Sequence, residues 1–142
     1  SRTDSRAVYG IDDAIERTKC YIDAGAEICF ADGIGTREEL EKFAKELSGS
    51  GAYLVANMIE GGKTPLIPAK ELEQMGFSLV FWACSAVYTI SKALYDLFGN
   101  LAQDGTTEKS LDRMIEFSQF NSMIGLDTYK EYERKYKVDR DD

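Results

Sequence analysis

The chain has 142 residues, with 17 basic and 25 acidic side chains, three cysteines and no histidine. The absence of histidine excludes a Ser-His-Asp triad, a Cys-His pair and the zinc sites that use histidine. The net charge of −8 argues against a nucleic-acid-binding groove and against attraction to an anionic membrane, and the length with 44% hydrophobic residues matches one ordinary domain.

The first half of the sequence alternates amphipathic helices with short apolar runs. Apolar spacing predicts a helix over residues 11–24 and then a buried strand over residues 26–31. Thr36 followed three residues later by Glu39 is typical of a capping box, and it predicts the start of a second helix. Residues 52–56 follow as another buried strand, so the order is helix, strand, helix, strand.

The same alternation continues after a polar, glycine-rich loop. A short helix is predicted over residues 68–75, a strand over 77–82 and a long helix over about 85–103. Such alternation favours an α/β fold with a parallel sheet and right-handed crossovers. Two further helical stretches, 108–120 and 126–136, extend the chain beyond this pattern.

Parallel α/β folds place their chemistry where strands end. Asp32 and Asn57 follow predicted strands, and Arg2 would stand at a third strand end if a strand precedes it. Arg2 has a planar fork of donors that suits a carboxylate or a phosphonate, and its alternative is a surface salt bridge with Asp4 or Asp12. Asp32 suits an acid, a base or a hydrogen-bond acceptor, or else an ordinary turn residue. Asn57 begins a loop that is either the edge of a lid or an inert turn.

That loop contains Gly62-Lys63-Thr64, which invites comparison with a phosphate-binding loop. Such a loop needs a glycine at the position of Asn57, and Pro65 disrupts the helix start that would hold the phosphates. The sequence therefore argues against nucleotide binding.

The cysteines and the apolar runs indicate the compartment. Cys20, Cys29 and Cys84 are scattered and form no Cys-x-x-Cys pair, which predicts neither a disulfide framework nor a zinc site. The longest strongly apolar stretch, residues 77–90, is too short for a membrane span of about 20 residues. A cytoplasmic protein that contacts neither membranes nor nucleic acids is expected.

Four segments share a pattern with a known family. They are Arg2-Thr3-Asp4 with the helix that follows it, Ala24-Gly25-Ala26-Glu27, the loop from Asn57 to Pro65, and residues 121–136. In this order they resemble the Ala-Arg-Thr-Asp-Ala segment, the Ala-Gly-Ala-Asp strand entry, the Asn-Met-Thr-Glu-x-Gly-x-Thr-Pro loop and the C-terminal Ile-Gly-x-Asp-x-Tyr helix of the isocitrate lyase and phosphoenolpyruvate mutase superfamily.

The resemblance implies a (β/α)8 barrel, a fold that takes about 250 residues. We therefore expect residues 1–105 to be the C-terminal half of such a barrel, namely a strand tip and three βα units. Residues 106–138 are expected to be a helical extension, and residues 139–142 a frayed tail. The N-terminal half would be missing or lie on another chain, and this fragment alone would be inactive.

The family resemblance also implies the chemistry: a magnesium-dependent cleavage or rearrangement of a C–C or P–C bond in a small 2-oxo or 2-hydroxy acid. Arg2 would be the catalytic residue, and the substrate would contact Arg2, Asp32, Asn57, Met58 and Ile59. Asp32 falls where the lyases commonly have a glutamate, so that contact is one methylene shorter. The magnesium ligands and a lid cysteine are expected in the missing half, and no metal ligand is expected in this chain.

Departures from the family pattern bear on the substrate. Methylisocitrate lyases place arginines at the positions of Tyr88 and Phe117, and their loop threonine aligns with Ile59. Without those charges we expect a smaller carboxylate or phosphonate, such as oxaloacetate, a substituted malate or phosphonopyruvate. The alternative is a non-catalytic barrel relative that serves as a binding or assembly subunit.

The C-terminal helices predict a partner, because they carry more apolar residues than a solvated tail tolerates. These residues are Ile115, Phe117, Phe120, Met123 and Ile124. The family resemblance implies that a terminal helix is exchanged between subunits, in dimers that assemble to tetramers. The alternative is that the helices pack back on their own barrel.

Overall fold

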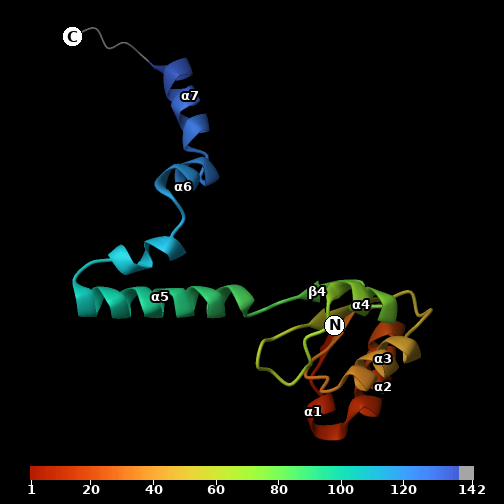
Figure 1. Ribbon diagram of the computed structural model, residues 1–142. Coiled ribbons are helices and arrows are strands. Elements are labelled where there is room, and N and C mark those ends of the chain that lie inside the picture. Colours follow the sequence, from red (N-terminus) through yellow and green to blue (C-terminus); the bar gives the residue numbers. More distant parts are fainter. Residues whose placement is uncertain (138–142) are drawn as a thin grey trace. The chain divides into compact units, whose positions relative to one another are not determined.

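The computed structural model describes residues 1–137, which form two compact units, residues 1–91 and residues 92 onward. The predicted tail at 139–142 lies outside the described residues. Figure 1 shows the chain as a ribbon, with the helices α1 to α7 and the strand β4 labelled. The first unit contains β1 (Arg2–Thr3), α1 (Arg6–Tyr9), α2 (Ile11–Asp23), β2 (Ile28–Ala31), α3 (Arg37–Glu46), β3 (Tyr53–Asn57), α4 (Ala69–Met75), β4 (Leu79–Phe81) and the start of α5 (Ser85–Asp104).

The four strands form one parallel sheet in the order β1-β2-β3-β4. In the register of the sheet, Arg2 lies beside Phe30, Phe30 beside Val55, and Val55 beside Leu79. All three pairs of neighbouring strands are parallel, so their carboxyl ends meet at one edge. The predicted α/β fold with a parallel sheet is therefore confirmed.

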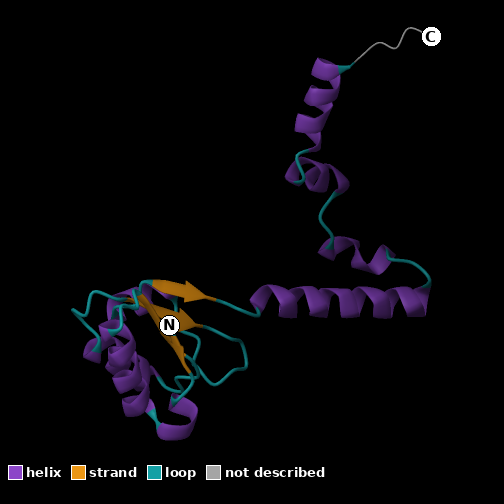
Figure 2. Cartoon of the chain, turned by 180° about the vertical axis from the view of Figure 1, so that it is seen from behind, coloured by secondary structure: helices purple, strands orange, loops and turns teal. Residues whose placement is uncertain are grey.

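One face of this sheet is packed against helices. The strand residues Thr3, Cys29, Ala31, Leu54 and Ala56 are buried together with Ala14 and Ile15 of α2, Leu40, Phe43 and Ala44 of α3, and Leu72 of α4. The purple helices α2 and α3 accordingly lie together on one side of the orange strands in Figure 2. The side chains on this face of the sheet alternate with those that point to the other face.

The other face of the sheet carries several exposed apolar side chains within residues 1–91. Ile28 is 52% exposed, Tyr53 60%, Leu79 53% and Phe81 37%. Phe30 on this face contacts Phe81 edge to face, with ring centroids 5.7 Å apart. An apolar sheet face is normally buried against a second layer or closed on itself. This face therefore needs further residues to cover it.

The start of the chain differs from expectation by one short helix. Residues 2–3 pair with β2 as a strand, and α1 then precedes the predicted helix of residues 11–24, which begins at Ile11 and ends at Asp23. Gly10, with φ of 87°, joins α1 to α2 in a conformation that favours glycine. Of the residues whose spacing predicted one buried face of this helix, Ala14, Ile15 and Thr18 are buried and Ile22 is partly buried.

The second unit contains the rest of α5, the 3₁₀-helix η1 (Glu108–Arg113), α6 (Phe117–Met123) and α7 (Leu126–Tyr136). The expectation of one helical stretch over 108–120 is wrong, because Met114 and Glu116 are extended and separate η1 from α6. Phe117 is 84% exposed and Met123 67%. Within residues 1–137, no helix combines the length and apolar character that a membrane crossing requires.

Candidate functional site

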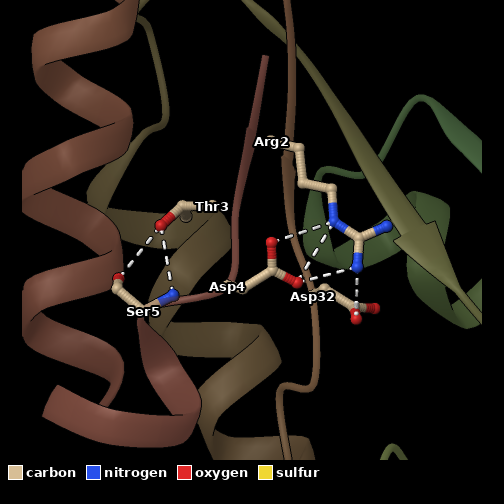
Figure 3. Close-up of polar contacts among 5 residues, drawn as sticks. All are labelled: Arg2, Thr3, Asp4, Ser5 and Asp32. Carbon is tan, nitrogen blue, oxygen red and sulfur yellow. Dashed lines mark hydrogen bonds and ion pairs between the residues drawn. The ribbon is translucent and has the colours of Figure 1, made fainter.

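Arg2 lies at the carboxyl edge of β1, between two carboxylates. Its Nη2 is 2.7 Å from Asp4 Oδ1 and 2.8 Å from Asp32 Oδ2, and its Nε donates to both oxygens of Asp4 at 3.2 Å. Figure 3 shows the guanidinium reaching toward both acids, while Thr3 points to the opposite side of β1. The guanidinium carbon also lies 5.2 Å from the ring centroid of Phe30. These contacts hold Arg2 at the edge of the sheet.

The positive charge of Arg2 and the negative charges of its partners Asp4 and Asp32 stabilise each other. The hydrogen bond from Arg2 lowers the pKa of Asp4, and the hydrogen bond to Asp4 with the charge of Asp32 raises the pKa of Arg2. The salt bridge of Arg2 with Asp4 that the sequence left open is therefore present. Asp12 pairs instead with Lys42, at 2.5 Å. Arg2 nevertheless remains 55% exposed, so its guanidinium can still reach a ligand.

A second arginine holds the turn that follows Asp32. Arg6 donates to Glu39 Oε2 from Nη2 at 2.7 Å and from Nε at 3.0 Å, and the same oxygen accepts the N–H of Gly35 at 2.8 Å. Both side chains are mostly covered, at 23% and 22% exposure. A Cβ on Gly35 would lie 3.0 Å from the guanidinium carbon of Arg6, so glycine permits this close approach. The network links α1, the β2–α3 turn and α3.

Glu39 thus does more than the predicted capping box requires. Thr36 accepts the N–H of Glu39 at 3.2 Å, which is the helix cap that the sequence indicated. The Glu39 carboxylate, however, is used by Arg6 and Gly35. Burial by itself would raise the pKa of Glu39, but the hydrogen bonds from Gly35 and Arg6 outweigh it, and the pKa lies below its usual value.

The candidate residues of the next strand lie at the end of β3. Asn57 is partly buried, and its Oδ1 is buried without a hydrogen-bond partner in the described structure. The Met58 side chain is fully buried, and its N–H donates to the carbonyl of Phe81 at 2.9 Å. The Met58 N–H is therefore engaged in the sheet. Of the Met58-Ile59 backbone, the Ile59 N–H carries no hydrogen bond within residues 1–137.

A cavity of about 230 Å³ brings several of these residues together. Its lining consists of Asp4, Ala7, Asp32, Gly33, Asn57, Ile59, Gly62, Lys63 and Thr64. They come from the end of β3 and from the segments that follow β1, β2 and β3, which is the edge of the sheet that the sequence indicated. The predicted residues Asp32, Asn57 and Ile59 line the cavity, and Arg2 joins it through Asp4 and Asp32. Met58 is buried and does not line it.

Sequence reasoning missed several residues of this site. Lys63 and Thr64 were considered as part of a phosphate loop and of the loop that resembles the family, but not as site residues, yet they line the cavity as a cation and a hydroxyl. The ion pair of Arg6 with Glu39 joins residues 33 positions apart, and no local sequence pattern indicates it. Position in the loop after β3 was the one signal that could have indicated Lys63.

The described residues do not by themselves form a magnesium site. Mg²⁺ prefers several carboxylate, phosphate or water oxygens. Within residues 1–137, no group of three Asp, Glu, Cys or His side chains is placed to hold a metal ion. Asp4 and Asp32 are both engaged by Arg2.

Comparison with known proteins identifies relatives over nearly the whole chain. A family model described as phosphoenolpyruvate phosphomutase matches residues 1–102. The chain is 39% identical over 140 residues to 2,3-dimethylmalate lyase from Eubacterium barkeri, covering 99% of this chain and 47% of that protein. It is 40% identical over 139 residues to the chloroplastic carboxyvinyl-carboxyphosphonate phosphorylmutase of Arabidopsis thaliana, covering 96% of this chain and 40% of that protein. The chain thus spans about half the length of the curated relatives it matches.

Solved structures agree with this assignment. The crystal structure of 2,3-dimethylmalate lyase, a member of the PEP mutase/isocitrate lyase superfamily, matches with a TM-score of 0.81 and 30% identity, covering 94% of this chain and 46% of that one. Phosphonopyruvate hydrolase, crystallised with oxalate and Mg²⁺, matches in fold with a TM-score of 0.78 at 19% identity, covering 96% of this chain and 48% of that one. The predicted fold, part of a (β/α)8 barrel with additional C-terminal helices, is confirmed.

Proposed function

The chain belongs to the phosphoenolpyruvate phosphomutase family, and we propose that it contributes half of a barrel enzyme that cleaves or rearranges a C–C or P–C bond in a small 2-oxo or 2-hydroxy acid. The observation that carries this proposal is Arg2, held between Asp4 and Asp32 beside the cavity. An arginine in this setting binds a carboxylate or phosphonate and stabilises negative charge as the bond breaks.

The residues around Arg2 complete this proposed substrate site. Asn57 and the Ile59 N–H supply donors for a carboxylate from the loop after β3, and Met58 fixes the base of that loop through its bond to Phe81. Asp32 accepts a hydrogen bond from the substrate or orients Arg2 toward it. In this scheme Arg2 is the catalytic residue and the other four bind or position the substrate.

We propose that the remaining half of the barrel covers the exposed inner face of the sheet. That face carries Ile28, Tyr53, Leu79 and Phe81, each more than a third exposed, beside the charged edge of the cavity. Barrel interiors are filled by side chains that alternate along each strand, as these do. The magnesium ligands would come from the same missing half, and without it this chain is expected to be inactive.

The substrate is proposed to carry fewer negative charges than methylisocitrate. Tyr88 stands where the methylisocitrate lyases are expected to have an arginine, and the neighbouring Cys84 thiol raises the pKa of its phenol. A phenol that stays neutral cannot neutralise a third carboxylate. Oxaloacetate, a substituted malate or phosphonopyruvate suits this site better.

The test is an activity screen of the full-length protein with Mg²⁺ against 2,3-dimethylmalate, oxaloacetate, phosphonopyruvate and 2-methylisocitrate. We expect turnover of one of the first three, with kcat/KM at least about tenfold above that for 2-methylisocitrate, because each unpaired carboxylate loses a charge-assisted contact. Preference for 2-methylisocitrate would contradict the assignment of substrate. Turnover of none of them, together with no oxalate binding by calorimetry, would favour the binding or assembly subunit.

The second unit is proposed to bury its apolar residues against another subunit. Phe117, Phe120 and Met123 of α6 are 84%, 43% and 67% exposed, and Ile124 follows at 50%. We expect a dimer or tetramer by sedimentation of the full-length protein, and a shift toward smaller species when Phe117 and Met123 are both changed to serine. A monomeric wild-type protein at micromolar concentration would contradict this.

The compartment proposed is the cytoplasm, because Cys20, Cys29 and Cys84 are all free thiols.

A further inference from the structure

The loop between β3 and α4 forms one wall of the cavity. Ile59, Gly62, Lys63 and Thr64 of this loop line it, next to Asn57 at the end of β3. The loop has no helix or strand from residue 58 to residue 68. The shape of the site therefore depends on what holds these residues in place.

The base of the loop is anchored in the core. Besides the bond from its N–H to Phe81, Met58 accepts the N–H of Ile67 on its sulfur at 3.4 Å, and both side chains are buried. A turn closes the middle of the loop, in which the Gly62 N–H donates to the carbonyl of Ile59 at 3.0 Å. These bonds fix the two ends of the loop but do not tie its middle to the rest of the protein.

Glu60 connects the middle of the β3–α4 loop to the rest of the protein. Its Oε1 accepts a hydrogen bond from the hydroxyl of Ser85, the first residue of α5. Within residues 1–137, Glu60 is the only side chain between positions 59 and 66 that hydrogen-bonds or ion-pairs outside the loop. Ser85 thereby connects the loop after β3 to the segment that follows β4.

The charge of the Glu60 carboxylate and the burial of one of its oxygens make the hydrogen bond from Ser85 important for the position of the loop. The hydrogen bond from Ser85 lowers the pKa of Glu60, so the group is ionised at neutral pH. Its second oxygen, Oε2, is buried and has no partner in the described structure. If the Ser85 hydroxyl is removed, the Glu60 carboxylate loses the donor that ties it to a segment outside the loop. The carboxylate is then free to turn toward water, and the loop that carries it is no longer held to Ser85.

We propose that Ser85 is a positioning residue of the substrate site, which acts through Glu60 to hold the β3–α4 loop against the cavity. Ser85 does not line the cavity itself. The inference rests on the proposed function, since it assigns to this contact the placement of Asn57, Ile59 and Lys63 around the substrate. It adds a connection between two barrel segments that are 25 positions apart in sequence.

The test compares Ser85→Ala with Ser85→Thr and Ser91→Ala in the full-length protein. Threonine keeps the hydroxyl, and Ser91 is an exposed serine of the same helix that makes no hydrogen bond through its side chain within residues 1–137. Hydrogen exchange of the amides of residues 59–66 is measured first. We expect exchange about tenfold faster in Ser85→Ala, wild-type rates in Ser91→Ala and substantial recovery in Ser85→Thr, all with unchanged Tm.

Steady-state kinetics on the substrate found active then test the link to function. Ser85→Ala is expected to raise KM about tenfold while kcat changes less than about twofold, because binding groups are displaced and the reacting groups are not. Unchanged loop exchange in Ser85→Ala would overturn the tie itself. Faster exchange with wild-type KM would overturn its role in substrate binding. If the wild-type protein turns over no substrate, the proposed function fails, while the exchange experiment still decides whether Ser85 holds the loop.

Discussion

Replacing Arg2 with alanine is expected to lower kcat/KM of the full-length enzyme by about 10²–10³-fold, because a preorganised cationic donor beside the reacting carboxylate is lost. Arg2 is held by Asp4 at 2.7 Å and by Asp32 at 2.8 Å, so its guanidinium is already oriented when the substrate arrives. Arg2→Lys keeps the charge but loses the planar fork, and it should recover only part of the rate. Steady-state kinetics with circular dichroism on the same samples measures both effects.

Arg37→Ala is the matched control for this experiment. Arg37 also forms two ion pairs, with Glu41 and Glu71, and it is 48% exposed compared with 55% for Arg2. It does not line the cavity. We expect Arg37→Ala to retain near wild-type activity. An equal loss of activity in both variants, or a near wild-type Arg2→Ala, would remove Arg2 from its proposed catalytic role.

Replacing Arg6 with methionine is expected to destabilise the protein by about 1–3 kcal/mol at pH 7, since Glu39 is then left partly buried without its charged partner. Methionine retains most of the apolar volume of the arginine side chain, so the lost energy is that of the polar network. Urea denaturation of the full-length variant measures the free energy of unfolding. Arg17→Met, at an exposed pair with Asp13, is the control and should change stability little.

The same variant predicts a dependence on pH. The folded-state pKa of Glu39 lies below its usual value, so its contribution is complete above the unfolded-state pKa of about 4.3 and is lost as the pH falls through the folded-state value. The difference in stability between wild type and Arg6→Met should therefore be constant from pH 6 to 8 and shrink below about pH 4. A difference that grows on acidification would contradict the assigned role of Glu39.

Local signals predicted most of the elements and the edge of the sheet that carries the site. The Thr36 cap, the buried stripe of α2 and the left-handed Gly76 that ends α4 are decided by residues within a few positions of one another. The helix predicted over 108–120 failed because its periodicity could not reveal the extended backbone at Met114 and Glu116. Periodicity reports which face is apolar, and it does not report where a helix is interrupted.

The sequence by itself determined the alternation of helices and strands, the parallel sheet and the placement of Asp32 and Asn57 at strand ends. These follow from local spacing and from the rule that parallel strands share one carboxyl edge. Only the tertiary structure decided how those residues are engaged. It showed Arg2 bridging Asp4 and Asp32, Arg6 holding Glu39, and Ser85 holding Glu60. The physical reason is separation along the chain. The partners in the pairs Arg2–Asp32, Arg6–Glu39 and Ser85–Glu60 are 25 to 33 positions apart. Such partners are selected by the packing of the strands and loops, and no local pattern encodes them.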